Sequence, residues 1–221
     1  MAIRSSHPRL AVLFGALLAA ALGLAALGGT LWAMGTTAPL LEAWMDWDAA
    51  PQLTEADRTA IARLTADVMA GRAETFQYKG LFSPQAETHM ADCTPLFRLT
   101  RTVGLSGFGV FFVSAALCFL FRRPRETGIG MLIGTGALLA AVLALGVWGL
   151  IDFDSLFRSF HGVMFTNDDW LFPPGDLLIT LMPLSFFIRC AAVAGGLWLA
   201  VLLCAAGTAV VLIRRARRVN E

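Results

Sequence analysis

Four long apolar stretches constrain this chain more than any other feature of its sequence. They cover residues 10–34, 103–121, 129–150 and 186–213 and are nearly free of charged side chains. At about 1.5 Å per residue, each is long enough to cross a hydrocarbon core of about 30 Å as an α-helix. We therefore predict an all-α membrane protein with four transmembrane helices, forming a single integral membrane domain over residues 1–221.

Two details of these stretches refine that prediction. The first stretch is longer than the roughly 7 to 15 apolar residues of a signal-peptide core, so we expect it to be retained. Glycines inside the stretches are common where membrane helices pack closely, and we interpret Gly15, Gly134, Gly136 and Gly195 as packing positions.

Composition excludes several classes of function. The chain is 57% hydrophobic and only 15% charged, whereas about a quarter of the residues in a soluble domain are charged. A net charge of +1 gives no indication of nucleic-acid binding. The sequence has neither a glycine-rich phosphate loop nor a CxxC pair, which argues against nucleotide chemistry and a cysteine zinc site. The lipid bilayer is therefore the first partner to consider.

Arginines next to the apolar stretches predict the orientation, because basic flanks are held on the cytoplasmic side. The arginines on one side are Arg4, Arg9, Arg122, Arg123, Arg125, Arg214, Arg215, Arg217 and Arg218. Only Glu126 and Glu221, of the 16 acidic residues, accompany them there. We therefore expect both termini in the cytoplasm. Segments 35–102 and 151–185 would then form an extracytoplasmic, mainly helical cap.

Two helix starts are predicted within the first cap segment. Thr54 followed by Asp57 is typical of a capped N-terminus, and Ile61, Leu64 and Val68 recur after it at helical spacing.

The second helix start is Ser83 before Pro84, because serine can accept free backbone N–H groups and proline suits the first turn. We expect a short helix from this point to about Cys93, broken by Pro95.

Two of the three histidines are candidates for chemistry. His89 and His161 lie in the cap segments among aromatic residues, and the ordinary pKa of an imidazole is near neutrality. His7 lies in a cytoplasmic flank and is not a candidate. The alternative for each cap histidine is a hydrogen-bonded structural role.

The neighbours of His89 allow three kinds of site. Asp92, three residues on, shares its helical face and could orient the ring as a base, or form a surface ion pair. Cys93, four residues on, could form a Cys–His nucleophile or be a small buried residue. A metal site made of both histidines with Asp92, Asp168, Asp169 and Asp176 lacks a paired spacing such as HExxH. A disulfide between Cys93 and Cys190 on the oxidising side is a further alternative.

Two stretches resemble the motifs of one membrane-protein family. Residues 81–97, LFSPQAETHMADCTPLF, are similar to a pattern of phenylalanine–serine, an acidic residue and then histidine–methionine–x–aspartate. Residues 160–187, FHGVMFTNDDWLFPPGDLLITLMPLSFF, are similar to FHxxFFxNDxWxxDPxxDxLIxxxPxxFF. With four spans and a cap, the sequence resembles the lipoprotein intramolecular transacylase family.

The sequence departs from the family pattern in three places. Cys93 stands where valine is usual, Phe172 and Pro173 interrupt the usual aspartate–proline, and Leu184 follows Pro183 where a polar residue is commoner. The first departure argues against Cys93 as a required nucleophile.

This resemblance implies a multi-pass enzyme of the bacterial cell membrane. Its substrate would be a diacylglyceryl lipoprotein, in which an acyl chain moves from the glyceryl sn-2 oxygen to the α-amino group of the N-terminal cysteine. The family's two catalytic histidines map to His89 and His161. No cofactor or metal is implied, and the resemblance indicates no oligomeric state.

The reaction suggests roles for other cap residues. One histidine would act as base toward the amine while the other steadies the oxyanion or protonates the leaving oxygen. Supporting residues would be Asp92, Asn167, Asp168 and Asp176, with Asn167 either donating to the oxyanion or closing a turn. Walls that exclude water would come from Phe157, Phe160, Phe165, Trp170 and Phe172, unless these aromatics only pack at the membrane interface. The rival functions are a metal-dependent membrane hydrolase and a non-catalytic membrane assembly factor.

Overall fold

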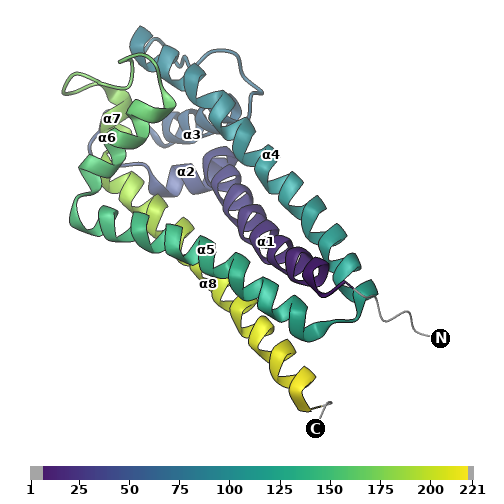
Figure 1. The fold of residues 1–221 in the computed structure, drawn as a ribbon. Helices are drawn as coiled ribbons and strands as arrows, with labels where there is room; N and C mark the ends of the chain where they lie inside the picture. Colours follow the sequence, from purple (N-terminus) through teal and green to yellow (C-terminus); the bar gives the residue numbers. More distant parts are fainter. Residues whose placement is uncertain (1–6, 219–221) are drawn as a thin grey trace. The chain divides into compact units, whose positions relative to one another are not determined.

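The computed structural model of the protein describes residues 7–218, and this part of the chain is helical with no strand (Figure 1). The helices are α1 (Pro8–Thr36), α2 (Ala38–Trp44), α3 (Glu55–Met69), α4 (Pro84–Phe121), α5 (Pro124–Ile151), α6 (Phe153–Met164), α7 (Leu177–Leu181) and α8 (Leu184–Arg218). The prediction of an all-α protein is confirmed. Arg4 and Glu221, which entered the orientation prediction, lie outside the described residues.

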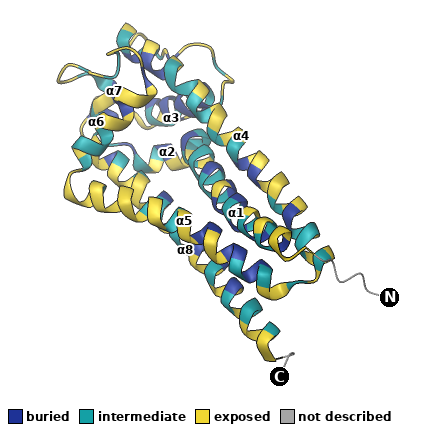
Figure 2. Cartoon of the chain, in the orientation of Figure 1, coloured by how far each residue is buried: buried dark blue, intermediate teal, exposed yellow. Residues whose placement is uncertain are grey.

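In the described part of the chain, four helices are long and apolar enough to cross a membrane, and each contains one of the predicted stretches. They are α1, α4, α5 and α8, with 28 to 38 residues each. Exposed residues occur along these helices (Figure 2). Among them are the large apolar residues Phe112 and Phe119 of α4, which are 66% and 77% exposed. Such exposure suits contact with lipid, where apolar side chains are in their preferred solvent.

Helix α4 corrects one prediction. We expected a short helix that ends near Cys93 and is broken by Pro95, but α4 continues through Pro95 to Phe121. Proline removes one backbone donor, which leaves the carbonyl of Ala91 without its helical partner. Ala91 is exposed, so water can hydrate this carbonyl and the helix need not end there.

The described chain forms two compact units. The bundle unit comprises the described residues of Met1–Gly29, Thr102–Gly146 and Gly195–Glu221. The second, here called the cap unit, comprises Thr30–Arg101 and Val147–Ala194. Each unit is described separately below. That the whole chain acts as a single membrane domain stays a prediction.

Close backbone contact characterises α1 and α5 in the bundle unit. A side chain at Gly134 would collide with the carbonyl of Ala16, and one at Gly15 would collide with that of Thr127. These two glycines are therefore packing positions, as predicted. A methyl group at Gly136 or Gly195 would meet no atom of residues 7–218 outside its own helix backbone and chain neighbours within 4 Å, so the packing interpretation is wrong for these two.

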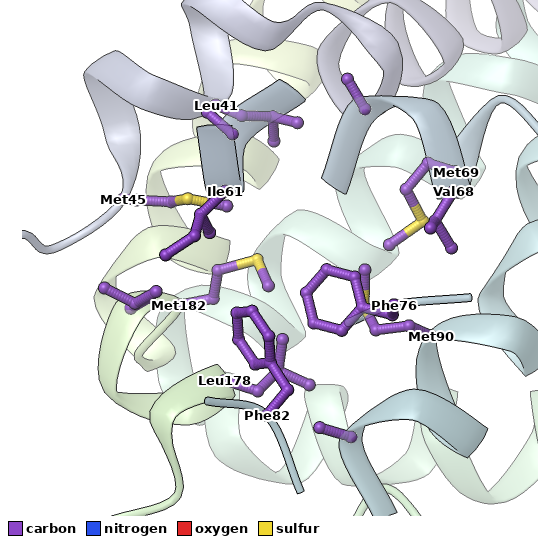
Figure 3. Packing of buried hydrophobic residues seen from close by; sticks show 14 of the residues in the cluster. Leu41, Met45, Ile61, Val68, Met69, Phe76, Phe82, Met90, Leu178 and Met182 are labelled. Atoms are coloured by element: carbon purple, nitrogen blue, oxygen red, sulfur yellow. The ribbon is translucent and has the colours of Figure 1, made fainter. Parts of the chain in front are cut away.

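A hydrophobic core holds the cap unit together (Figure 3). Ile61 of α3, Phe76 of the following loop, Met90 of α4 and Leu181 of α7 are each at most 1% exposed. Burying such side chains contributes about 1.5 to 3 kcal/mol each. The core thus fixes the first turns of α4, which carry His89, against segments far away in sequence.

Helix α3 begins as predicted from its cap. Thr54 and Asp57 form a reciprocal capping box, in which each side chain accepts a hydrogen bond from the other's backbone N–H. Asp57 also accepts hydrogen bonds from Tyr78 and Lys79, each at 2.7 Å. Together these contacts attach the loop after α3 to the start of that helix, and they hold the pKa of Asp57 well below its ordinary value.

Candidate active site

The structure brings the two candidate histidines together within the cap unit. His89 lies in the second turn of α4 and His161 near the end of α6, 72 positions later in the chain. Their ring centroids are 6.0 Å apart with an angle of 27° between the planes. Both side chains are buried, at 8% and 7% exposure. The structure thus brings together the two histidines to which the resemblance assigns one reaction.

Helix α6 positions His161, and the sequence had not indicated this helix. Asp152 caps its N-terminus by accepting from the backbone N–H of Ser155. One face of α6 carries His161, and neighbouring positions carry the exposed apolar residues Phe160 and Val163. His161 is therefore held at the boundary between the core of the cap unit and an apolar surface.

Aromatic rings surround both histidines. Phe165 contacts both, with its centroid 5.0 Å from His89 and 5.5 Å from His161. Phe172 lies 5.6 Å from His89, and Trp170 lies 5.0 Å from His161. The predicted pocket residues Phe160, Phe165 and Trp170 therefore all contact His161, with Phe160 at 5.5 Å in an edge-on arrangement.

One hydrogen bond selects the tautomer of the neutral His161 ring. Its Nδ1 lies 2.8 Å from the carbonyl oxygen of Phe157. A carbonyl can only accept, so Nδ1 carries the proton and Nε2 keeps its lone pair. Burial lowers the pKa of His161 and so favours the neutral ring, whereas the hydrogen bond to Phe157 acts in the opposite direction. His161 thus has the form of a general base.

The surroundings of His89 leave one ring nitrogen without a partner. Nε2 lies 3.6 Å from Sγ of Cys93, whereas Nδ1 is buried and has no hydrogen-bond partner among residues 7–218. His89 belongs to the part of α4 that lies in the cap unit, before the apolar stretch 103–121. Burial is the main cause that lowers its pKa to about 4. The charge of His161 adds to this effect and Asp92 opposes it.

Asp92 does not orient His89 in the way one of our sequence interpretations suggested. Its carboxylate accepts a hydrogen bond from the side-chain amide of Asn167 at 2.8 Å, and within the described chain no bond joins it to the His89 ring. Asp92 acts on His89 through charge alone.

Asn167 closes a turn and supports an aromatic wall. Its side-chain oxygen accepts from the backbone N–H of Asp169, and its carbonyl accepts from Nε1 of Trp170 at 3.0 Å. With the bond to Asp92, Asn167 links α4 to the tryptophan that contacts His161. We refer to Asp92, Asn167 and Trp170 as the strap.

Asp168 and Asp176 lie outside the histidine pair's immediate contacts. The backbone carbonyl of Asp168 accepts from Leu171, and its side chain is exposed. Asp176 accepts from the hydroxyl of Ser83 at 2.6 Å and caps α7 through the N–H of Leu178. No group of three potential metal-ligating side chains occurs within residues 7–218.

Cys93 does not have the properties of a nucleophile. Burial raises the pKa of its thiol to about 12, so the thiolate form is scarce at neutral pH. It also does not pair with Cys190, since both are free cysteines.

Gln85 was missed by the sequence analysis. Its side-chain amide donates to the carbonyls of both Asp169 and Leu171 at 3.1 Å, which fastens the loop after α6 to the first turn of α4. Gln85 lies within residues 81–97, but the sequence did not single it out because its partners are more than 80 positions away.

Comparison with known proteins shows where the chain belongs. The model of the family described as lipoprotein intramolecular transacylase Lit matches residues 17–187, which is most of the chain and includes both histidines. The protein belongs to the Lit family. No curated protein sequence matches it significantly.

Solved structures share its fold. The membrane-integral lipoprotein intramolecular transacylase Lit from Bacillus cereus is 20% identical in sequence, with a TM-score of 0.73 over 97% of this chain and 100% of that one. A histidine-to-arginine variant of the Bacillus cereus protein is 17% identical, with a TM-score of 0.71 over 96% of this chain and 94% of that one. The Lit fold of four apolar helices is therefore the fold of this multi-pass membrane protein.

Proposed function

We propose that this protein moves an acyl chain within a diacylglyceryl lipoprotein, from the glyceryl sn-2 oxygen to the α-amino group of the N-terminal cysteine. Membership of the Lit family supports this reaction class. The observation that carries the proposal for this chain is the pair of buried imidazoles whose centroids lie 6.0 Å apart among aromatic rings.

The hydrogen bonds of the pair suggest how the work is divided. His161 holds its proton on Nδ1 through Phe157, so its Nε2 accepts the proton of the attacking amine. The buried Nδ1 of His89 has no partner within the described chain, and it would stabilise the oxyanion of the tetrahedral intermediate by donating a hydrogen bond.

The steps balance without any protein-bound acyl intermediate. The amine nitrogen attacks the ester carbonyl, the new C–N bond forms, and His161 takes the proton from nitrogen. The C–O bond to glycerol then breaks, and the protonated imidazole returns its proton to the departing oxygen. The product is an amide with a free glyceryl hydroxyl. Because both reacting groups belong to one molecule, holding them together can supply an effective molarity of about 10⁵ M or more.

The aromatic walls would suppress the competing reaction with water. Phe165 contacts both imidazoles and is 9% exposed, so it excludes solvent from the space around them. Hydrolysis would release the acyl chain as a fatty acid, and a poorly hydrated site disfavours it. The exposed apolar residues of α6, Phe160, Val163 and Met164, would face the acyl chains of lipid or substrate.

The arginine flanks support an orientation of the protein in the membrane. We propose that the protein lies in a bacterial cell membrane with both termini in the cytoplasm and the cap unit outside. Labelling with a membrane-impermeant maleimide tests this orientation, with a single cysteine introduced by Ser159→Cys or by Arg218→Cys.

Conversion of a synthetic diacylated lipopeptide tests the proposed reaction. The full-length protein in nanodiscs should yield a lyso-form peptide whose acyl chain is on nitrogen, as read by tandem mass spectrometry. His89→Ala and His161→Ala should each abolish this product, while the matched change His7→Ala should leave it unchanged. If both cap variants still form the product, the proposed role of the pair is wrong.

Treatment with a chelator distinguishes the transacylase from the rival metal-dependent hydrolase. The transacylase should keep its full rate after treatment with EDTA. Loss of activity on chelation, with recovery on adding Zn²⁺, would support a metal-dependent hydrolase instead.

A further inference from the structure

Cys93 occupies the helical position one turn after His89. Residues four apart share a face of an α-helix, and here the Sγ atom lies 3.6 Å from Nε2 of the imidazole. This distance falls within the range of a hydrogen bond that involves sulfur. The thiol is half-buried against the core of the cap unit, and it is the group that contacts this nitrogen.

The contact can be made with the proton on either atom. An imidazole nitrogen with a lone pair is a good acceptor, whereas sulfur is only a weak one. The pairing S–H to Nε2 is therefore the stronger of the two. The raised pKa of Cys93 means that the thiol keeps the proton it needs for this bond.

A hydrogen bond from the thiol to Nε2 has a consequence for Nδ1, the other nitrogen of the His89 ring. With Nε2 accepting from the thiol, a neutral ring carries its proton on Nδ1. Nδ1 is buried and has no hydrogen-bond partner within residues 7–218. The titratable groups that act on His89 are His161 from α6 and Asp92 from its own helix, while Phe165 and Phe172 cover the ring from the loop after α6.

We propose that Cys93 is a positioning residue for acyl transfer: its thiol donates to Nε2 of His89 and so keeps a proton on Nδ1, where the ring can donate to the substrate's oxyanion. This inference rests on the proposed function. It assigns a specific task to a position at which the resembling family pattern has valine.

The substitution Cys93→Val removes the donor at nearly constant volume, and Cys93→Ser restores a donor. The loss of this weak hydrogen bond should reduce the Nδ1-protonated fraction of His89, and with it kcat, by about twofold to fivefold. KM should be unchanged, since the thiol does not contact substrate. Cys190→Val is the matched control, because Cys190 is a half-buried cysteine of the same unit and packs against the same core.

Two readouts test the proposal on the full-length protein in nanodiscs. Nitrogen NMR of ¹⁵N-histidine-labelled protein reports which ring nitrogen of His89 carries the proton, independently of activity. Wild type, Cys93→Ser and Cys190→Val should show Nδ1 protonated, and Cys93→Val should show a mixture with Nε2. The rate of lyso-form product with a diacylated lipopeptide should follow the same order.

The proposal is overturned if Cys93→Val retains the wild-type tautomer and kcat, or if Cys93→Ser behaves like Cys93→Val. Failure of the proposed function looks different. In that case wild type itself yields no lyso-form product, while the NMR comparison still decides whether the thiol sets the tautomer of His89.

Discussion

Nδ1 of His161 lies 2.8 Å from the carbonyl oxygen of Phe157, one helical turn earlier in α6. This single bond makes the two histidines of the site chemically different although both are buried. It assigns the proton of His161 to Nδ1 and leaves Nε2 as an acceptor. His89 lacks such a bond, and its buried Nδ1 has no hydrogen-bond partner among residues 7–218. In the proposed reaction, His161 would be the base and His89 the donor.

The buried state of His89 predicts a dependence of stability on pH. Its pKa in the folded protein is lowered from an ordinary 6.5 to about 4, so the unfolded chain binds more protons between these values. The stabilisation is fully present above pH 6.5 and is lost as the pH falls toward 4. Thermal unfolding in detergent at pH 4 to 8 should show Tm decreasing below pH 6.5.

His89→Asn is the comparison for that experiment, because asparagine does not titrate. The variant should lose less Tm than wild type between pH 6.5 and 4. An equal loss in both proteins would contradict the assignment of this pH window to His89.

Asp57 predicts a second, separate window. Its pKa is lowered because Lys79, Thr54 and Tyr78 donate hydrogen bonds to its carboxylate. Its contribution to stability is therefore present above the ordinary value of 3.8 and is lost as the pH falls below that value. Asp57→Asn should lower Tm at pH 7, and its difference from wild type should shrink in strong acid. A constant difference at all pH values would show that the charge of Asp57 is irrelevant.

The strap predicts a selective loss of activity. Asn167→Ala removes the bond to Asp92 and loosens the turn that holds Trp170 against His161. Because small misplacements near reacting groups are costly, we expect the rate to fall by about tenfold to a hundredfold. The rate of lyso-form product measures this effect, with the adjacent exposed position Thr166→Ala as control. Equal rates for the two variants would show that the strap does not contribute to catalysis.

Ser83 predicts an effect on stability rather than on chemistry. Its hydroxyl accepts from the N–H of Ala86 at the start of α4 and donates to Asp176 at the start of α7. Ser83→Ala should lower the free energy of unfolding by about 1 kcal/mol, which is typical for a lost helix cap. Chemical denaturation followed by tryptophan fluorescence measures it, with the exposed Ser159→Ala as control. An unchanged midpoint would contradict the coupling of these two helix starts.

Features that depend on local sequence could be predicted, and those that depend on distant contacts could not. The four apolar stretches and the capping box of Thr54 and Asp57 are local patterns, and all of them appear in the structure. The proximity of His89 and His161 followed from the family resemblance, since no local rule joins residues so far apart. Gln85 and the bond between Asp92 and Asn167 depend on how the loop after α6 folds back onto α4.

The error at Pro95 has a similar origin. A proline signals the end of a helix when propensity alone is considered. Tertiary packing on both sides of Pro95 determines the outcome instead, because Met90 is buried in the core of the cap unit and α4 continues as an apolar span. The exposed carbonyl of Ala91 makes the continuation tolerable.

The same substitution at the two histidines tests the central claim most directly. Asparagine reproduces the donor of a histidine at the Nδ1 position and eliminates Nε2. In single-turnover conversion of a diacylated lipopeptide followed by mass spectrometry, His161→Asn should lose about 10²- to 10⁴-fold in rate, since the base is gone. His89→Asn should stay within about tenfold of wild type, since one donor replaces another. Wild-type activity in His161→Asn, or a deeper loss in His89→Asn than in His161→Asn, would contradict the division of roles.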